Sequence, residues 1–445
     1  MGRRSLANEL NDPLTLAIAP PSDETPEQRA IRLREEEDAK QISDEIDRQI
    51  EADAAELKRK RKAVIKVLLL GQSESGKSTA LKNFQLTCAP KQWSQERETW
   101  RTVIQLNLTR SINTILDALP EDSDFQTRLG SLTNVQRELE RRLGASSREE
   151  QQRALSDSED DTPEPEPVQQ EVYVRSYDRW MSAISKLLPI FSTGREEDAA
   201  TRALANCRDD MRSLCDDNTV RDLIRQKRIR LEDCADFFIH HIDRIASYDY
   251  SPSDDDVVHA RLRTIGVQEH RLIFEKGHNT GREFLMYDVG GSRSSRAAWP
   301  AYFDDVNAII FLVPVNCFDE RLAEDRRINR LDDSLRLWKA VCKNKLLAKT
   351  QLILFLNKCD LLEKKLKSGA KFKDYARSFD KANDKAGVTR YLRHRFMDIS
   401  KQVSPEPRTI YAHLTTLTDT KTTAITLSDV QDGILQSQLT KYDLL

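Results

Sequence analysis

The sequence contains no long hydrophobic run, no cysteine framework and no strong excess of either charge. No stretch of 18 apolar residues occurs, so no membrane-spanning helix is expected. The seven cysteines are odd in number and include no CxxC pair, which indicates reduced intracellular thiols and argues against a disulfide framework or a zinc site. The formal net charge of -3 gives no reason to expect nucleic-acid binding.

The N-terminus also carries few membrane signals. It lacks the apolar core of a signal peptide, and no cysteine precedes Cys88 as a palmitoylation site. Met1-Gly2 permits myristoylation, but Leu6 stands where that signal has Ser or Thr. Acylation of Gly2 and an ordinary second residue are both left open. One weak lipid signal would give only marginal attachment, so peripheral membrane association stays undecided.

Hydrophobic periodicity divides the chain into segments of different character. Residues 1–26 are polar and contain several prolines, which predicts a flexible N-terminus. Residues 27–62 carry Ile42, Ile46 and Ile50 at a spacing of four, which predicts a long polar helix with a narrow apolar stripe. This stripe either packs on the helix's own domain or is available to a partner.

Short apolar runs after residue 62 predict a parallel sheet. Helical patterns separate most of these runs, as is typical of a doubly wound α/β domain. The predicted strands are Val64–Leu70, Glu283–Tyr287, Ala308–Val315, Leu352–Leu356 and Thr409–Thr415. We therefore assign residues 63–98 and 259–445 to one α/β domain.

Residues 99–258 interrupt that domain and contain no strand-like run. Ile104 and Leu108 begin a series of apolar residues at helical spacing, which predicts an inserted all-helical domain. Within it, residues 156–167 (SDSEDDTPEPEP) are acidic and rich in proline, a composition that cannot build a core. We predict a disordered insertion at about 120–170.

The segment from Gly71 to Thr79 (GQSESGKST) fits the phosphate-binding pattern G-x-x-x-x-G-K-[ST], between a predicted strand and a predicted helix. Backbone N–H groups of such a loop surround a phosphate, and the helix N-terminus adds positive charge. Lys77 would lie between the β- and γ-phosphates, and Ser78 would ligate Mg²⁺. The other predicted nucleotide contacts of the loop are Glu74, Ser75, Gly76 and Thr79. A glycine-rich turn without a ligand is the alternative.

A second motif, NKCD at residues 357–360, ends another predicted strand. The Asp360 carboxylate can accept hydrogen bonds from guanine N1–H and the exocyclic amine, a donor pair that adenine does not present. Asp360 therefore favours GTP over ATP and disfavours an ATPase or kinase. Asn357 would brace the loop, and Lys358 would lie along the base.

A third motif, DVGG at residues 288–291, follows the strand that begins at Glu283. Asp288 would hold a Mg²⁺-bound water, and the Gly291 N–H would sense the γ-phosphate. The alternative, a simple β-turn, is plausible only for the motif in isolation. Asp288 lies 212 positions after Gly76, a gap far longer than that of a small GTPase.

With these motifs at these spacings, the chain resembles the α subunit of a heterotrimeric G protein, and a divergent fungal member in particular. That family fills the long gap with a helical domain. Further matching segments are Trp100–Ile104, Asp243–Ala246, Leu322–Asp325, Thr418–Thr420 and Lys441–Leu445. The resemblance implies a Ras-like doubly wound P-loop GTPase domain with an inserted all-helical domain and an N-terminal helix. It also implies Mg²⁺-dependent binding of GTP and GDP and hydrolysis of GTP to GDP and phosphate.

The resemblance assigns further roles residue by residue. Arg261 matches the catalytic arginine supplied within the same chain, a role for which the α subunits are themselves the standard example. Thr264 matches the second Mg²⁺ ligand, and Asp233 matches a helical-domain residue that faces the nucleotide. Leu417 falls where the family contacts guanine through a backbone N–H. Lys77 completes the implied catalytic set.

Two substitutions depart from the family around the γ-phosphate. Ser292 replaces the glutamine that orients the attacking water, and Ser73 replaces a glycine of the phosphate loop. A serine hydroxyl is too short to contact both water and phosphate, so we predict hydrolysis slower by on the order of 10²-fold or more. Alternatively, Ser73 and Ser292 hold a water between them and compensate. Asp333 also stands where the family has a glutamate that pairs with an arginine, here Arg296, and we expect the shorter carboxylate to weaken the activated conformation.

The resemblance implies three partners. The N-terminal helix would bind a βγ dimer, the C-terminal tail would bind a G-protein-coupled receptor, and the region around Ser292 would bind an effector. The implied location is cytoplasmic, with attachment to the inner face of the plasma membrane left open. The alternative function is a hydrolysis-deficient GTP-binding scaffold that does not cycle with a receptor.

Overall fold

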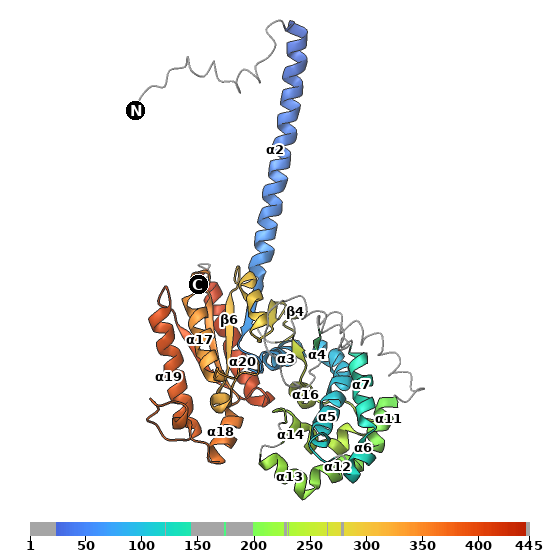
Figure 1. Ribbon diagram of the computed structural model, residues 1–445. Helices are drawn as coiled ribbons and strands as arrows, with labels where there is room; N and C mark the ends of the chain where they lie inside the picture. Colours follow the sequence, from blue (N-terminus) through green and yellow to red (C-terminus); the bar gives the residue numbers. More distant parts are fainter. Residues whose placement is uncertain are drawn as a thin grey trace, which may run out of the picture. The chain divides into compact units, whose positions relative to one another are not determined.

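The computed structural model (Figure 1) describes residues 24–120, 122–143, 173–174, 199–226, 229, 231–264, 266–276 and 280–441. Side chains are described at these positions except at residues 52–63, 173–174, 263–264 and 438–441. Most of the predicted flexible N-terminus lies outside the described residues. Within the described part of the chain, no helix combines the length and apolarity needed to cross a bilayer.

The first compact unit, Met1–Val64, contains the long helix α2 (Pro26–Ala63), where a helix was predicted over residues 27–62. A capping box starts the helix, because the Thr25 hydroxyl accepts from the Gln28 N–H at 3.3 Å while the Gln28 side chain accepts from the Thr25 N–H at 3.1 Å. Ile42 and Ile46 remain 62% and 50% exposed. In the described part of α2, the side chains of the apolar stripe are therefore largely exposed to solvent.

The second compact unit, Ile65–Leu445, is built on a six-stranded sheet of order β4-β5-β1-β6-β7-β8. The strands are β1 (Val64–Leu70), β4 (Val267–Ile273), β5 (Glu283–Val289), β6 (Ala308–Pro314), β7 (Gln351–Asn357) and β8 (Ile410–Leu414). β6 pairs in parallel with β1 and β7, β7 pairs in parallel with β8, and β4 runs antiparallel to β5. The predicted α/β fold is confirmed, with one antiparallel edge strand added.

Helices cover both faces of this sheet (Figure 1). They are α3 (Lys77–Cys88), α17 (Arg330–Lys343), α18 (Cys359–Lys367), α19 (Lys385–Val403) and α20 (Thr420–Lys441). Successive residues of β6 point to opposite faces. Ile310 therefore joins the core formed with Phe84 of α3 and Ile434 of α20, while the Phe311 ring lies 5.1 Å from the Trp338 ring of α17. We call this part of the chain the sheet domain.

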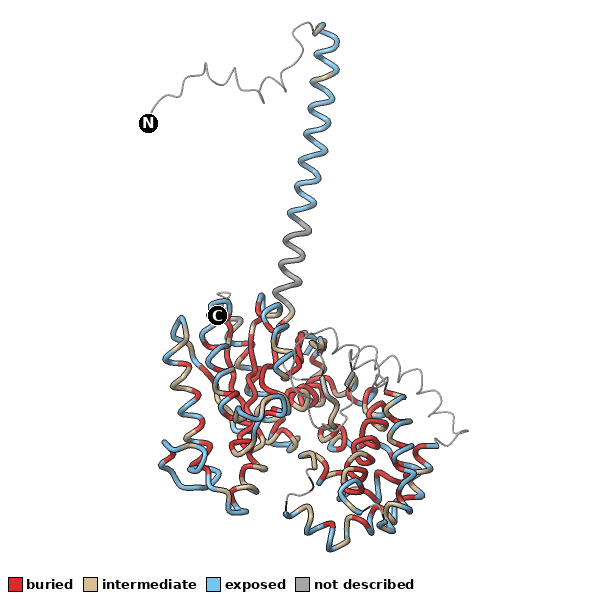
Figure 2. Tube along the Cα trace, viewed as in Figure 1, coloured by how far each residue is buried: buried red, intermediate tan, exposed pale blue. Residues whose placement is uncertain are grey.

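The segment between the sheet strands β1 and β4 forms a separate helical core, the helical domain. Its helices are α4 (Pro90–Arg97), α5 (Arg101–Leu116), α6 (Asp124–Leu129), α7 (Leu132–Arg142), α11 (Ala199–Asn206), α12 (Arg208–Asp216), α13 (Asn218–Arg225), α14 (Ala235–His240), α15 (Ile242–Ile245) and α16 (Asp254–His259). The central helix is α5, which packs against α7, α14 and α15 and is buried along most of its length (Figure 2). α5 therefore forms the centre of this domain, with polar as well as apolar side chains among its buried residues.

The predicted disordered insertion at about 120–170 is wrong over its first part. Residues 124–129 and 132–142 form α6 and α7, and Leu129, Leu132 and Leu139 are fully buried in the helical core. These leucines provide the apolar surface that the acidic stretch further along lacks. Residues 144–172, which include that stretch, lie outside the described residues.

Two short strands form a second, separate sheet. Tyr173–Val174 (β2) pairs in parallel with Arg263–Thr264 (β3). β3 follows the return of the chain from the helical domain, which ends near Ala260. The backbone of the predicted Mg²⁺ ligand Thr264 is therefore placed in a strand pair, while its side chain lies outside the described residues.

Candidate functional site

The phosphate loop connects β1 to α3, as its sequence predicts. Gly71 and Gly76 have φ angles of +146° and +101°, which favour glycine. A Cβ on Gly71 would lie 2.4 Å from the Leu312 carbonyl oxygen, and one on Gly76 would lie 2.4 Å from Asn357 Nδ2. The two glycines therefore allow the loop to curl tightly against β6 and β7, with the N-terminus of α3 at its end.

Lys77 and Ser78 begin α3 and turn toward that loop. The Lys77 ammonium donates to the Gly71 carbonyl at 3.0 Å and to the Gln72 carbonyl at 2.8 Å. Burial lowers the pKa of Lys77 to about 8, while the Asp288 carboxylate acts in the opposite direction. The Ser78 hydroxyl donates to Asp288 Oδ2 at 2.6 Å. A hydroxyl and a carboxylate, 210 residues apart in sequence, thus meet beside the lysine.

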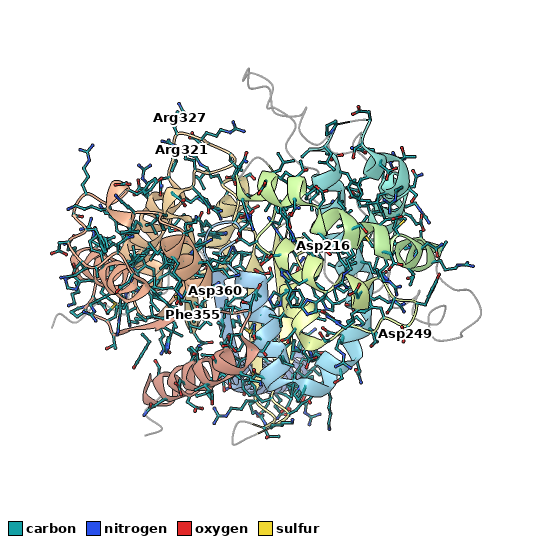
Figure 3. All side chains as sticks on the ribbon, turned by 90° about the horizontal axis from the view of Figure 1, so that it is seen from below. Asp216, Asp249, Arg321, Arg327, Phe355 and Asp360 are labelled. Atoms are coloured by element: carbon teal, nitrogen blue, oxygen red, sulfur yellow. The ribbon has the colours of Figure 1, made fainter. Side chains whose placement is uncertain are left out.

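The NKCD motif lies at the end of β7 and is tied to the phosphate loop. Asn357 Nδ2 donates to the Ser75 carbonyl at 2.9 Å, and Asn357 Oδ1 accepts from the Leu417 N–H at 3.3 Å. Asn357 therefore links three loops. Asp360 lines the cavity, and in Figure 3 it lies between the C-terminal helices of the sheet domain and the helices of the helical domain. Leu417 is buried, with 2% of its surface exposed, so its side chain packs in the core of the sheet domain.

Arg261 follows α16, where the chain returns to the sheet domain. The side-chain amide of Asn107 on α5 fixes its backbone, accepting from the Arg261 N–H at 2.6 Å and donating to its carbonyl at 3.0 Å. The guanidinium donates to Glu74 Oε1 at 2.7 Å, and its Nη1 lies 3.3 Å from Glu232 Oε1. Burial lowers the pKa of Arg261, but these two carboxylates outweigh it and raise the pKa above its ordinary value.

Glu74 receives a second guanidinium that the sequence does not reveal as part of the site. Arg330, at the start of α17, donates to Glu74 Oε2 at 3.1 Å, to the Ser73 carbonyl at 3.0 Å and to Glu320 Oε2 at 2.7 Å. Burial raises the pKa of Glu74, but Arg261 and Arg330 outweigh it and lower the pKa to about 2. Glu74 is therefore a carboxylate at neutral pH that joins two arginines across the loop.

Gln72 is another unpredicted member of the site. Its side chain is buried and donates to the Arg330 carbonyl at 2.6 Å and to the Ser334 hydroxyl, so the phosphate loop is fastened to α17. The motif pattern accepts any residue at this position. Neither its burial nor its partners could be read from the motif.

The DVGG segment approaches the phosphate loop closely. A Cβ on Gly291 would lie 2.4 Å from Gln72 C and Ser73 N, so only glycine fits here. Ser292 follows, and its hydroxyl lies 2.7 Å from the Ser295 hydroxyl and 3.2 Å from the Ser294 hydroxyl. Among the described contacts, none joins Ser292 to Ser73. The alternative, a water held between Ser73 and Ser292, stays a prediction.

Arg296 and Asp333 pair closely despite the shorter carboxylate. Arg296 Nη1 donates to Asp333 Oδ1 at 3.0 Å, and Nη2 donates to Asp333 Oδ2 at 2.7 Å. The exposed fractions of the two side chains are 15% and 9%. Both bonds of a two-point contact therefore form with the shorter carboxylate. A weaker activated conformation stays a prediction.

Both domains line one cavity of about 630 Å³. Lys358 has a φ angle of +64°, and its ammonium donates to Asp233 Oδ2 on the helical-domain side at 2.6 Å. The predicted residues that line this cavity are Glu74, Ser75, Gly76, Lys77, Ser78, Thr79, Asp233, Arg261, Asp288, Gly291, Ser292, Asn357, Lys358, Asp360 and Leu417. Thr264 has no described side chain. Residues predicted from separate motifs are thus gathered around one space.

Comparison with known proteins agrees with this arrangement. The family model for the G-protein alpha subunit matches residues 40–434. The guanine nucleotide-binding protein alpha-4 subunit of Mycosarcoma maydis is 28% identical, over 96% of this chain and 94% of the relative. The alpha-16 subunit of Caenorhabditis elegans is 30% identical over 92% and 98%, and the alpha-1 subunit of M. maydis is 32% identical over 91% and 96%. The chain therefore belongs to the G-protein alpha subunit family.

Proposed function

We propose that this chain is a signalling switch that binds GTP and GDP with Mg²⁺. One observation carries the proposal: Lys77, Ser78, Asp288 and Asp360 line the same cavity. Lys77 supplies positive charge for the β- and γ-phosphates, and the N-terminus of α3 adds to it. Asp360 supplies the acceptor that selects guanine. The cavity volume of about 630 Å³ lies in the usual range for a small-molecule site.

The residues present suit a magnesium ion. Ser78 Oγ and Asp288 Oδ2 lie 2.6 Å apart, and hydroxyl and carboxylate oxygens are the hard ligands that Mg²⁺ prefers. Ser78 would ligate the ion directly, Asp288 would do so through a water, and Thr264 would supply a second direct ligand. The ion would contribute charge stabilisation to the phosphates.

We further propose that GTP hydrolysis is slow. Arg261 would stabilise the charge that develops in the transition state, and Lys77 would assist at the β- and γ-phosphates. Ser292 replaces the residue that would orient the attacking water, and its hydroxyl contacts Ser294 and Ser295. A hydrolysis-deficient scaffold is the second candidate function, and the same serine favours it.

The partners follow from family membership. The exposed stripe of α2 would bind a βγ dimer, the segment around Ser292 would bind an effector, and the C-terminal tail would bind a receptor. Tail residues 442–445 lie outside the described residues. We propose a cytoplasmic location. Mass spectrometry of the N-terminal peptide would decide whether acylated Gly2 attaches the protein to the inner face of the plasma membrane.

The test of nucleotide choice is competition against a fluorescent GTP analogue in the presence of Mg²⁺. GTP and GDP should displace the analogue, while ATP at the same concentration should not. Asp360→Asn should weaken GTP binding roughly ten- to a hundredfold, because it removes a charged acceptor from two donors. The exposed Asp380→Asn serves as the matched control. Equal displacement by ATP and GTP would contradict the proposal.

A further inference from the structure

Two neighbouring carboxylates of the helical domain contact cations that line the cavity. Asp233 lies 2.6 Å from Lys358 Nζ, and Glu232 lies 3.3 Å from Arg261 Nη1. The Cys234 thiol also donates to Glu232 Oε2 at 3.6 Å, which helps to orient that carboxylate. We call these two contacts, Glu232–Arg261 and Asp233–Lys358, the bridging pairs.

The Glu232 contact differs from its neighbour because it engages the proposed catalytic arginine. Arg261 lies between Glu74 of the phosphate loop and Glu232, so two carboxylates from different domains share one guanidinium. Arg330 also pairs with Glu74 and Glu320 nearby. A guanidinium has a fixed fork of N–H donors. A donor directed at Glu232 is not directed at a phosphate oxygen.

We propose that Glu232 is a positioning residue that restrains Arg261 and holds the two domains together over the nucleotide. This inference rests on the proposed function. Glu232 competes with the phosphates for the guanidinium, so it slows both hydrolysis and nucleotide release. Reaction at the phosphates requires Arg261 to exchange one carboxylate contact for a phosphate contact. Release of the nucleotide requires the link Glu74–Arg261–Glu232, which joins the phosphate loop to the helical domain, to open at one of its two contacts.

The test compares wild type with Glu232→Gln, which keeps the shape of the side chain and removes its charge. Two rates are measured with Mg²⁺ present: release of a fluorescent GDP analogue, and single-turnover hydrolysis at saturating GTP. The side chains of Arg261 and Glu232 are 26% and 35% exposed, so solvent screens the pair and each rate should rise roughly two- to fivefold. Glu406→Gln, an exposed site remote from the cavity, should change neither rate.

A double-mutant cycle shows whether Glu232 acts through Arg261. In an Arg261→Gln background, adding Glu232→Gln should leave GDP release unchanged. Thermal unfolding of every variant controls for a general loss of structure. A full effect of Glu232→Gln in that background would overturn the inference, as would failure of either rate to rise in the single variant.

The two proposals fail in different ways. If wild type binds the GDP analogue normally and Glu232→Gln behaves like it, only the inference about Glu232 is overturned. If wild type does not bind guanine nucleotides at all, the proposed function is overturned, and the inference falls with it.

Discussion

Ser292 is the residue on which the proposed slow hydrolysis of GTP depends. Its hydroxyl is engaged with Ser294 and Ser295, and Gly291 before it lies against the phosphate loop. The backbone before Ser292 therefore lies against the phosphate loop, while the Ser292 side chain is shorter than the water-positioning glutamine of the family. Rate depends steeply on such positioning.

Replacing Ser292 with glutamine should restore a water-positioning group. We expect single-turnover γ-phosphate release to accelerate by on the order of tenfold or more. Ser294→Gln, two positions away, is the matched control and should leave the rate unchanged. Adding Ser73→Gly should increase the gain if the loop serine crowds the new side chain. Equal rates for wild type and Ser292→Gln would contradict the slow-hydrolysis proposal.

Lys82 is a buried residue on α3 whose side chain donates to two backbone carbonyls. Its ammonium donates to the Val257 carbonyl at 2.9 Å and the Ala260 carbonyl at 2.6 Å, and it lies 4.0 Å from the centre of the Trp100 ring. Burial lowers its pKa to about 7. Lys82 therefore connects α3 to the segment where the chain leaves the helical domain.

This lowered pKa predicts a pH dependence of stability. Between about pH 7 and the ordinary lysine range, the unfolded chain binds more protons at Lys82 than the folded chain does. The free energy of unfolding should therefore rise with pH across that window, by up to about 1.4 kcal/mol per pH unit from this group. Lys82→Met should remove this contribution in urea titrations, most clearly between about pH 7 and 8, because Lys77, with its pKa of about 8, adds a slope of the same sign above that range. The exposed Lys91→Met should retain the wild-type slope. An unchanged slope in Lys82→Met would refute this explanation.

At the scale of elements, the strands with continuous apolar runs could be predicted closely. β1 has the predicted bounds Val64–Leu70, and β6 differs from its prediction by one residue. β4 (Val267–Ile273) was missed, because this edge strand alternates buried and solvent-facing residues and contains Glu269 and Arg271. Helices α6 and α7 were missed because their residues were grouped with the acidic, proline-rich stretch at residues 156–167, whose composition they do not share.

The candidate site likewise contains residues that the sequence predicts and residues that it does not. Its loops follow from motifs, because a motif carries its own backbone geometry within a few residues. Glu232, Gln72, Lys82 and Arg330 carry no such pattern. Each is an ordinary polar residue until the fold brings it beside a partner more than 25 positions away, as with Glu232 and Arg261. Only tertiary structure could reveal these contacts.

The packing of α7 can be tested through Leu139, which is fully buried in the helical core. Leu139→Ala should lower the free energy of unfolding by about 2–5 kcal/mol, because it removes buried apolar surface and leaves a cavity. The exposed Thr133→Ala on the same helix should have little effect. A negligible change for Leu139→Ala in urea unfolding would mean that α7 is not part of the core.

At the scale of the whole second unit, the two domains meet at two kinds of contact. Lys82 and the adjoining chain connections join them on one side, and the bridging pairs join them across the cavity. The bridging pairs are partly exposed ion pairs, so dissolved salt screens them more strongly than it screens buried contacts. Opening of the cavity should therefore be sensitive to ionic strength.

GDP release should accelerate as salt increases from about 0.05 to 0.5 M, a range over which the screening length falls severalfold. Asp233→Asn should raise the rate at low salt and flatten this dependence, because one bridging pair is already lost. Asp222→Asn, on the exposed surface of α13, should keep the wild-type dependence. Identical salt profiles for wild type and Asp233→Asn would show that the pair does not limit release.

The inserted position of the helical domain also has a consequence for how the chain is made. β1 pairs with β6, and the Lys66 N–H of β1 donates to the side chain of Asn307. These two residues are 241 positions apart, so the acceptor is synthesised long after the donor. The helical core is complete once Ala260 has been synthesised, and it brings its own ends together near α3. The loop that must close between β1 and β6 is then effectively much shorter, which lowers its entropic cost. A helical domain that folds first would therefore lower the entropic cost of pairing β1 with β6.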